Sequence, residues 1–396
     1  FTPHPTKSVW QPTQQLEHLG LTVDLAAGTF SVPAVKVARL ARMAKGLAIS
    51  AKLNKRRVPK RELASFCGYA QSVRLAVMPA NLFLRSLYDD CAKVSGWNGT
   101  VSLSRQSFRD LEWWADIPVQ HLSAPIRLRP ASVEVFVDAS DGGWGAVLPV
   151  LGDSPEGVAR GVWSPAELHM HINQKEMRAV RYALHAFESV VSDRVVRLHE
   201  DNTVTQAVLG RFASRSHALM QEYRLLWHVL EQLHIQLQVV RVASELNLAD
   251  APSRFVDNSD FRLDSQTFGW LERMWGPHSI DLFASAENAV LPRFYSMHRC
   301  LGSSGVDALV QSWAGHNGYA MPPFTSSILL QVVQKVREER VNVTLVVPCW
   351  PAQAWFHELM LLAVDSFQLP HATLTPGGPV AQPYCAWPLI AVRVEF

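Results

Sequence analysis

The sequence predicts a multidomain α/β protein, and three observations support that fold class. The 396 residues are 48% hydrophobic, which is enough for domains of about 100–200 residues with their own cores. Apolar residues recur at helical spacing from residue 34 to 93, whereas strand-like and helical runs alternate after residue 133. The segment between them is rich in Pro and Ser. We therefore expect a helical region (1–117), a linker (118–132), a mixed α/β region (133–257) and a second α/β region (265–396).

The N-terminal region is expected to begin with extended pieces and to continue with helices. Two apolar runs joined by a Gly-containing turn, LEHLGLTVDLAAGTFSVP at 16–33, predict a hairpin. The apolar periodicity predicts helices at 37–49, 58–77 and 104–117, the last with Ser104 as its N-cap.

Positive charge is concentrated in this region, although the net charge of the whole chain is only +2. Ten Lys and Arg residues and no acid lie between Lys36 and Arg61. A solvated helix face is the alternative explanation, but such faces usually carry both signs, so the run favours a polyanionic partner. The residues expected to contact phosphates are Lys52, Lys55, Arg56 and Arg57.

Cysteine usage and hydropathy indicate an intracellular protein of the cytoplasm or nucleus. The five cysteines are scattered, and no two have the spacing of zinc ligands. No run approaches about 18 apolar residues, and the N-terminus lacks the apolar core of a signal peptide. We expect no membrane partner. Because the chain does not start with Met, we expect it to be a piece of a longer polyprotein.

The middle region follows a mixed α/β order. Strands are expected at 133–138, 143–149, 160–164, 194–199 and 235–243, and helices at 174–189, 202–212 and 216–233. This order predicts a mixed five-stranded sheet with helices packed on it. The glycines that follow Asp138 are expected to allow a tight turn between the first two strands.

Four acids of this region lie where a packed structure alone does not require them. Asp138, Asp201 and Asp250 follow or end strands, and Glu176 lies at the start of a helix. Such termini can converge on one edge of a small sheet, where carboxylates repel one another and lose solvation. A hard divalent cation, Mg²⁺ or Mn²⁺, resolves both costs, and two ions about 3.5–4 Å apart can act on a phosphodiester. The alternative is that each acid is a cap or a surface charge, above all Asp201 in EDNT.

A second metal-ligand hypothesis concerns His169 and His171, which share one face if the segment is extended. With no third soft ligand nearby, packing or substrate contact is the favoured interpretation for both.

Four motifs then carry a resemblance. In order, they are VDASDGGWGAVL, HINQKEMRAV, HEDNTVTQAV and NLADAPSR. Together they resemble the RNase H domain of retrotransposon reverse transcriptases, in particular those of the DIRS-like, tyrosine-recombinase group. The resemblance implies Mg²⁺-dependent hydrolysis of the RNA strand of an RNA–DNA hybrid. Asp138 would bridge both ions, Glu176 and Asp201 would complete one site, and Asp250 the other.

The same resemblance places Asn173 and Asn202 close to the hybrid. Cellular members of the family carry a mobile His near the last acid, and no His occupies such a position here. Two alternatives remain open: a nucleic-acid-binding scaffold without turnover, and a DNA adenine-N6 methyltransferase with an accessory RNase H fold. The presence of all four acids argues against the scaffold.

The first 117 residues resemble the thumb and connection of such reverse transcriptases, on the segment KSVWQPTQQLEHLGLTVD. This implies upstream fingers and palm domains as partners in the full polyprotein, and DNA as a further ligand. LYDDCAK at 87–93 resembles a polymerase acidic motif only superficially, because it ends a helical pattern. We therefore expect no polymerase activity from this chain.

The C-terminal region resembles the phage-type DNA adenine-N6 methyltransferases, a Rossmann-like fold, on the segments IDLFASAENAVLPRFYS, GVDALVQSW and GYAMPPFTS. The resemblance implies that Asp281 lies in an S-adenosylmethionine pocket. It also implies that Pro322, Pro323 and Phe324 hold a flipped base. Met321 stands where the family has an Asn or Asp acceptor, and a thioether accepts hydrogen bonds weakly. We therefore expect a methyltransferase fold with lost or feeble activity, and a packing or nucleic-acid-docking domain is the alternative.

Overall fold

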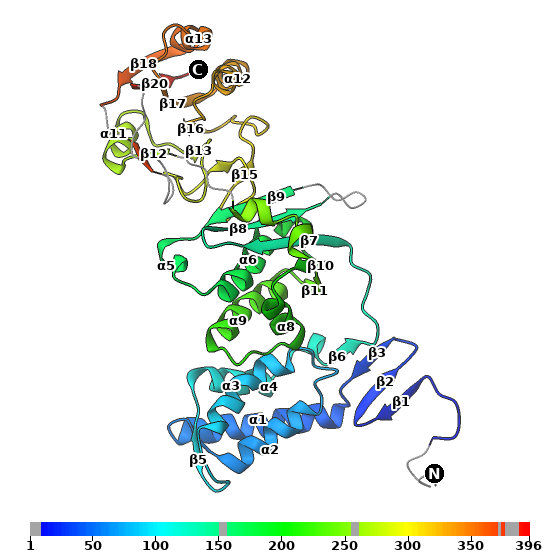
Figure 1. The fold of residues 1–396 in the computed structure, drawn as a ribbon. Coiled ribbons are helices and arrows are strands. Elements are labelled where there is room, and N and C mark those ends of the chain that lie inside the picture. The colour runs from blue at the N-terminus through cyan, green and yellow to red at the C-terminus, as the bar shows by residue number, and fades with distance from the viewer. Residues whose placement is uncertain (1–8, 150–156, 255–260, 371–373, 377–387) are drawn as a thin grey trace. The chain divides into compact units, whose positions relative to one another are not determined.

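A computed structural model describes residues 9–149, 157–254, 261–370, 374–376 and 388–396 (Figure 1). The chain divides into two units, residues 1–130 with 207–224, and residues 131–206 with 225–396. None of the helices in these ranges combines the length and the apolar character needed to cross a membrane.

The first unit opens with a four-stranded antiparallel sheet. Its order is β1-β2-β3-β6, with β1 at Gln15–His18, β2 at Leu21–Asp24, β3 at Thr29–Ser31 and β6 at Ser123–Pro125. The expected hairpin is therefore present. The expected linker 118–132 is partly wrong, because β6 pairs with β3 and buries Ala124. Pro125 fits there since β6 is an edge strand, where a missing N–H costs no ladder bond.

Helices make up the rest of this unit. They are α1 (Ala34–Leu53), α2 (Lys60–Gln71), α3 (Ala80–Ala92) and α4 (Arg105–Ala115), with β4 (Arg57–Pro59) and β5 (Thr100–Ser102) paired between them. The Ser104 hydroxyl accepts from the Ser107 amide, which confirms the predicted N-cap of α4. Asp90, of the superficial polymerase motif, lies in α3 and accepts from Ser107 and Lys93, so it has a structural role.

Residues 207–224 also belong to the first unit. They span the end of α8 (Thr203–Arg211) and the start of α9 (His217–Gln232). The Arg224 guanidinium donates two hydrogen bonds of 2.8 Å to the buried Asp110 carboxylate and a third to the Leu82 carbonyl. A buried charge needs such a partner.

The second unit contains the predicted mixed five-stranded sheet. Its order is β11-β10-β7-β8-β9, with β7 at Val133–Ala139, β8 at Gly143–Leu148, β9 at Gly157–Val162, β10 at Val195–Glu200 and β11 at Gln236–Arg241. β7, β10 and β11 are mutually parallel neighbours, whereas β8 and β9 run antiparallel. The helices beside them are α5 (Pro165–Leu168), α6 (Ile172–Ala186), α7 (Glu188–Val191), α8, α9 and α10 (Asp250–Arg254).

A second sheet lies further along the chain. Its order is β13-β16-β17-β20-β18, with β13 at Ile280–Asp281, β16 at Asn317–Ala320, β17 at Asn342–Pro348, β18 at Ala363–Gln368 and β20 at Leu389–Val394. β13, β16 and β17 are parallel, and β20 runs antiparallel between β17 and β18. The helices of this region are α11 (Ser265–Trp275), α12 (Ser326–Glu339) and α13 (Ala354–Leu362).

The short helix α10 lies directly on β8, and glycines permit that approach. A Cβ on Gly145 would lie 2.4 Å from the Ser253 amide nitrogen and 2.8 Å from the Ala249 carbonyl oxygen. Gly143 has a similar contact, 3.2 Å from the Ser253 carbonyl oxygen. Neither glycine has a positive φ, so the expectation that they serve the turn is wrong for these two. The turn is closed by the Ser140 hydroxyl, which accepts from the Gly143 amide at 3.1 Å.

Gly145→Ala is expected to push α10 off β8 and to destabilise the protein by about 1–3 kcal/mol, the usual cost of overpacking. Thermal unfolding of the purified chain measures this effect. Gly142→Ala is the matched control, because a Cβ there meets nothing within 4 Å. Equal melting temperatures for the two variants would contradict the close-packing role of Gly145.

Candidate metal centre

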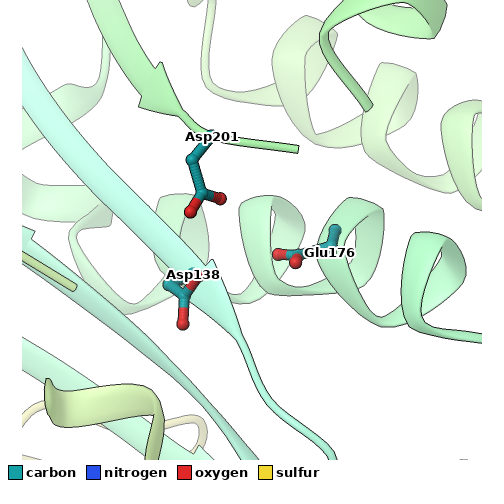
Figure 2. A group of neighbouring side chains, drawn as sticks. All are labelled: Asp138, Glu176 and Asp201. Carbon is teal, nitrogen blue, oxygen red and sulfur yellow. The ribbon is translucent and has the colours of Figure 1, made fainter. Parts of the chain in front are cut away.

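Three of the predicted acids meet at one edge of the five-stranded sheet. Asp138 is the penultimate residue of β7, and Asp201 directly follows β10. Because β7 and β10 are parallel neighbours, their carboxyl ends lie together. Glu176 comes from the second turn of α6, which packs on β7. Figure 2 shows the three side chains gathered there, and one oxygen of each lies within 4.8 Å of those of the other two.

Burial and mutual repulsion strongly perturb this group. Asp138 and Glu176 are each 4% exposed, and Asp201 is half-buried. Loss of solvation, reinforced by the charges of Asp138 and Asp201, raises the pKa of Glu176 to about 9. Burial also raises the pKa of Asp138, and Asp201 adds to the shift, while a hydrogen bond from Ser253 opposes it. The group therefore resists carrying three negative charges on its own.

The donor atoms fit a hard divalent cation. The Ala139 backbone amide hydrogen-bonds the Glu176 carboxylate, yet Glu176 Oε2 is buried and has no partner among the described residues. Three carboxylates, one with an unused buried oxygen, form the all-oxygen donor set that Mg²⁺ or Mn²⁺ prefers. A cation there would remove the repulsion that raises these pKa values.

The fourth predicted acid, Asp250, lies outside that group of three. It is the first residue of α10 and accepts two hydrogen bonds on Oδ1 from Arg254, at 2.9 and 2.8 Å. Its charge still contributes to the raised pKa of Asp138, so it lies near the group. The expected convergence therefore holds for three acids, and an ion pair engages the fourth.

The position of α10 is fixed by polar contacts to the strand that carries Asp138. The buried Asn247 amide donates to the Val137 carbonyl at 3.0 Å, and its oxygen accepts from the Ala249 amide. The Ser253 hydroxyl donates to Asp138 Oδ2, and the Ser253 carbonyl accepts from the Ser140 hydroxyl at 2.7 Å. These contacts explain why the NLADAPSR segment holds its place beside β7.

A fifth carboxyl group, Glu200, escaped the sequence analysis. It ends β10, is completely buried and accepts from the Asn202 amide at 3.1 Å. Burial, followed by the charge of Glu176, raises its pKa well above the usual range. Strand alternation was an available signal, because Val196, Leu198 and Glu200 share the buried face of β10.

The two asparagines predicted to lie near the substrate are in direct contact. Asn202 Nδ2 donates to Asn173 Oδ1 at 3.0 Å, which joins the start of α6 to the start of α8. Asn202 also caps α8 by accepting from the Val204 and Thr205 amides. His171 accepts from the Asn173 amide. Among the described residues, neither His171 nor His169 belongs to a group with metal-ligand geometry.

The predicted basic residues differ in their freedom. Lys52 pairs with Glu112 at 3.4 Å, whereas Lys55, Arg56 and Arg57 are exposed and form no ion pair with the described residues. Lys55 and Arg56 both have positive φ, 51° and 62°. They close the C-terminus of α1, where the Arg56 amide donates to the carbonyl two residues before Leu53, as in a Schellman motif.

The C-terminal predictions fall on adjacent parallel strands. Asp281 ends β13, is 2% exposed and accepts from the Val290 amide at 3.1 Å. Pro322, Pro323 and Phe324 follow β16, the neighbour of β13, at the same edge of the sheet. Pro322 is buried, Pro323 is exposed, and Phe324 packs with Met321 against a small apolar core.

Comparison with known proteins agrees with this geometry. Residues 129–227 match the family model described as the RNase H-like domain found in reverse transcriptase. Together with the five-stranded mixed sheet, the match defines this part of the chain as an RNase H-like domain of the type found in reverse transcriptase. No curated protein matches the sequence.

Three similar solved structures cover different shares of the chain. RNase H1 from the halophilic archaeon Halobacterium salinarum is 24% identical over 30% of this chain and 92% of that one, with a TM-score of 0.25. An N-terminal RNase H domain from Mycobacterium tuberculosis, fused to maltose binding protein, is 17% identical over 31% and 91%, with a TM-score of 0.26. A foamy viral protease-reverse transcriptase in complex with RNA/DNA hybrid is 13% identical, with a TM-score of 0.25. That match covers 63% of this chain and 33% of the viral one.

Divalent-cation affinity is expected to rise with pH. The Glu176 carboxyl, with a pKa of about 9, is protonated at neutral pH, so a cation has to displace that proton. Titration calorimetry with Mn²⁺ from about pH 6.5 to 8.5 should show affinity rising by up to about tenfold per unit. Glu176→Gln should bind more weakly and lose this slope. An affinity of the native chain that does not change with pH would contradict the prediction.

Proposed function

We propose that the RNase H-like domain hydrolyses the RNA strand of RNA–DNA hybrids. The observation that carries the proposal is the group formed by Asp138, Glu176 and Asp201, whose oxygens lie within 4.8 Å of one another at the edge of the sheet. Carboxylates this close, on a sheet of this topology, suit the binding of divalent cations beside a phosphodiester.

The residues of the site divide the work. Asp138, Glu176 and Asp201 would hold Mg²⁺ or Mn²⁺, with Asp250 at the margin for a second ion. When bound, the cations supply activation of water and neutralisation of the developing phosphate charge. Ser253 orients the Asp138 carboxylate, and the Ala139 amide orients that of Glu176.

Recognition of RNA is assigned to the asparagine pair. The Asn173 carbonyl oxygen accepts from Asn202, which fixes the Asn173 amide and leaves its NH₂ without an acceptor among the described residues. A fixed amide donor next to the acids suits a 2′-hydroxyl or a phosphate oxygen of the RNA strand.

The biological setting that we propose is reverse transcription of a retroelement of the DIRS-like group. It is supported by the match to the RNase H-like domain found in reverse transcriptase. It is also supported by the exposed cations Lys55, Arg56 and Arg57, which suit contacts with a nucleic-acid backbone. Upstream polymerase domains and DNA would then be partners of this chain inside the cell.

Asp138→Asn should abolish hybrid cleavage and leave hybrid binding largely intact. The amide keeps the shape of the side chain but removes an anionic ligand, so the rate should fall by more than about 100-fold, since loss of outer-sphere metal partners already costs 10–100-fold. Cleavage of a labelled hybrid with Mg²⁺, and with EDTA, measures the rate, and fluorescence anisotropy measures binding.

Asp141→Asn is the control, because Asp141 is an exposed acid in the turn after β7 and should cleave at the native rate. Equal loss of binding and cleavage in Asp138→Asn would point to a structural role for Asp138. Hybrid binding by the native chain with no cleavage under any divalent cation would favour the scaffold function.

For the C-terminal region, we infer a methyltransferase-type domain without transfer activity. The support is the position of Asp281 and of the Pro322–Phe324 loop at the carboxyl ends of adjacent parallel strands, where open α/β sheets bind ligands. Against transfer, Met321 offers an adenine amine only a weak acceptor and packs against the apolar core.

The native chain is therefore expected to transfer no labelled methyl group from S-adenosylmethionine to adenine-containing DNA. Restoring the acceptor with Met321→Asn tests the cause, because any activity that appears only in that variant would locate the defect. Methylation by the native chain at the rate of an active adenine methyltransferase would overturn the inference.

A further inference from the structure

A cation of the chain itself lies at the margin of the carboxylate group. Arg254, the last residue of α10, donates from Nε and Nη2 to the same oxygen of Asp250, at 2.9 and 2.8 Å. Both side chains remain accessible, with 64% of Arg254 and 42% of Asp250 exposed. The second carboxylate oxygen of Asp250 has no printed partner in the described part of the chain and faces no competing contact from Arg254.

The charge of Arg254 also reaches the group of three acids. Burial raises the pKa values of Asp138 and Glu176, and the guanidinium acts against both shifts. In return Asp250 first, and then Asp138 and Asp201, raise the pKa of Arg254. The guanidinium therefore offsets part of the charge that a divalent cation would otherwise neutralise.

The backbone under this pair is fixed, whereas the pair itself is weak. Ser253, the neighbour of Arg254, bonds Asp138 and Ser140, so α10 cannot move away freely. An exposed ion pair one helical turn apart is among the weakest in proteins. A divalent cation can therefore take the place of Arg254 on Asp250 without any rearrangement of the helix.

We propose that Arg254 is an internal counter-ion, which holds Asp250 until a divalent cation displaces it. Arg254 is then a positioning residue that lowers cation affinity, and the released guanidinium is free to face the phosphates of a bound strand. This inference rests on the proposed function only in that the acids bind divalent cations.

The test is Mn²⁺ binding in the absence of nucleic acid, measured by calorimetry on the full chain. Arg254→Ala should bind Mn²⁺ about 2- to 5-fold more tightly than the native chain, the range set by a surface ion pair. Arg254→Lys should remain close to native, because it keeps the charge. Arg194→Ala, an exposed arginine at the opposite end of β10, should leave the affinity unchanged.

A double-mutant cycle tests the route through Asp250. In an Asp250→Asn background, Arg254→Ala should change the Mn²⁺ affinity less than it does in the native chain, because the ion pair is already absent. Native or weaker Mn²⁺ binding by Arg254→Ala overturns the inference, and the proposed function still stands if the native chain cleaves hybrid. If Arg254→Ala binds Mn²⁺ more tightly but the native chain cleaves no hybrid, the counter-ion role stands and the proposed function fails.

Discussion

Repulsion among three partly buried carboxylates is the constraint on which the RNase H-like domain depends. Oxygens of Asp138, Glu176 and Asp201 lie within 4.8 Å of one another, and without a cation the cheapest response is to keep a proton on Glu176. Such a group persists only where rigid elements prevent its members from separating. The parallel pairing of β7 with β10 and the packing of α6 on β7 provide that rigidity. The metal-free site therefore stores unfavourable energy that cation binding releases.

The margin of this site is built on a different principle, which is close approach of backbones. α10 reaches β8 because Gly143 and Gly145 have no side chains, and Asn247 and Ser253 then fasten it to β7 through hydrogen bonds. The glycine-rich run after Asp138 and the NLADAPSR segment are therefore two halves of one contact. This contact explains why two motifs about a hundred residues apart in the sequence belong to a single site.

Sequence patterns were sufficient for the elements with strong periodicity. The strands expected at 133–138 and 194–199 are present as Val133–Ala139 and Val195–Glu200, because alternation of apolar residues reports directly on burial. Asp138 and Asp201 could be predicted to meet, since parallel strand ends share an edge. The ion pair of Asp250 could not, because it depends on where α10 begins. β6 was also missed, because its Pro and Ser residues resemble those of a linker and its partner β3 lies far away in the chain.

The turn at Lys55 and Arg56 has a consequence for the thermodynamics of recognition. Two successive non-glycine residues in the left-handed region cost free energy, of order 1–3 kcal/mol each, and the folded chain has already met that cost through the hydrogen bonds that close α1. The backbone under these cations is thus fixed before any polyanion arrives. Association then loses mainly side-chain entropy, so that a binding loop with few contacts can still hold a phosphate backbone.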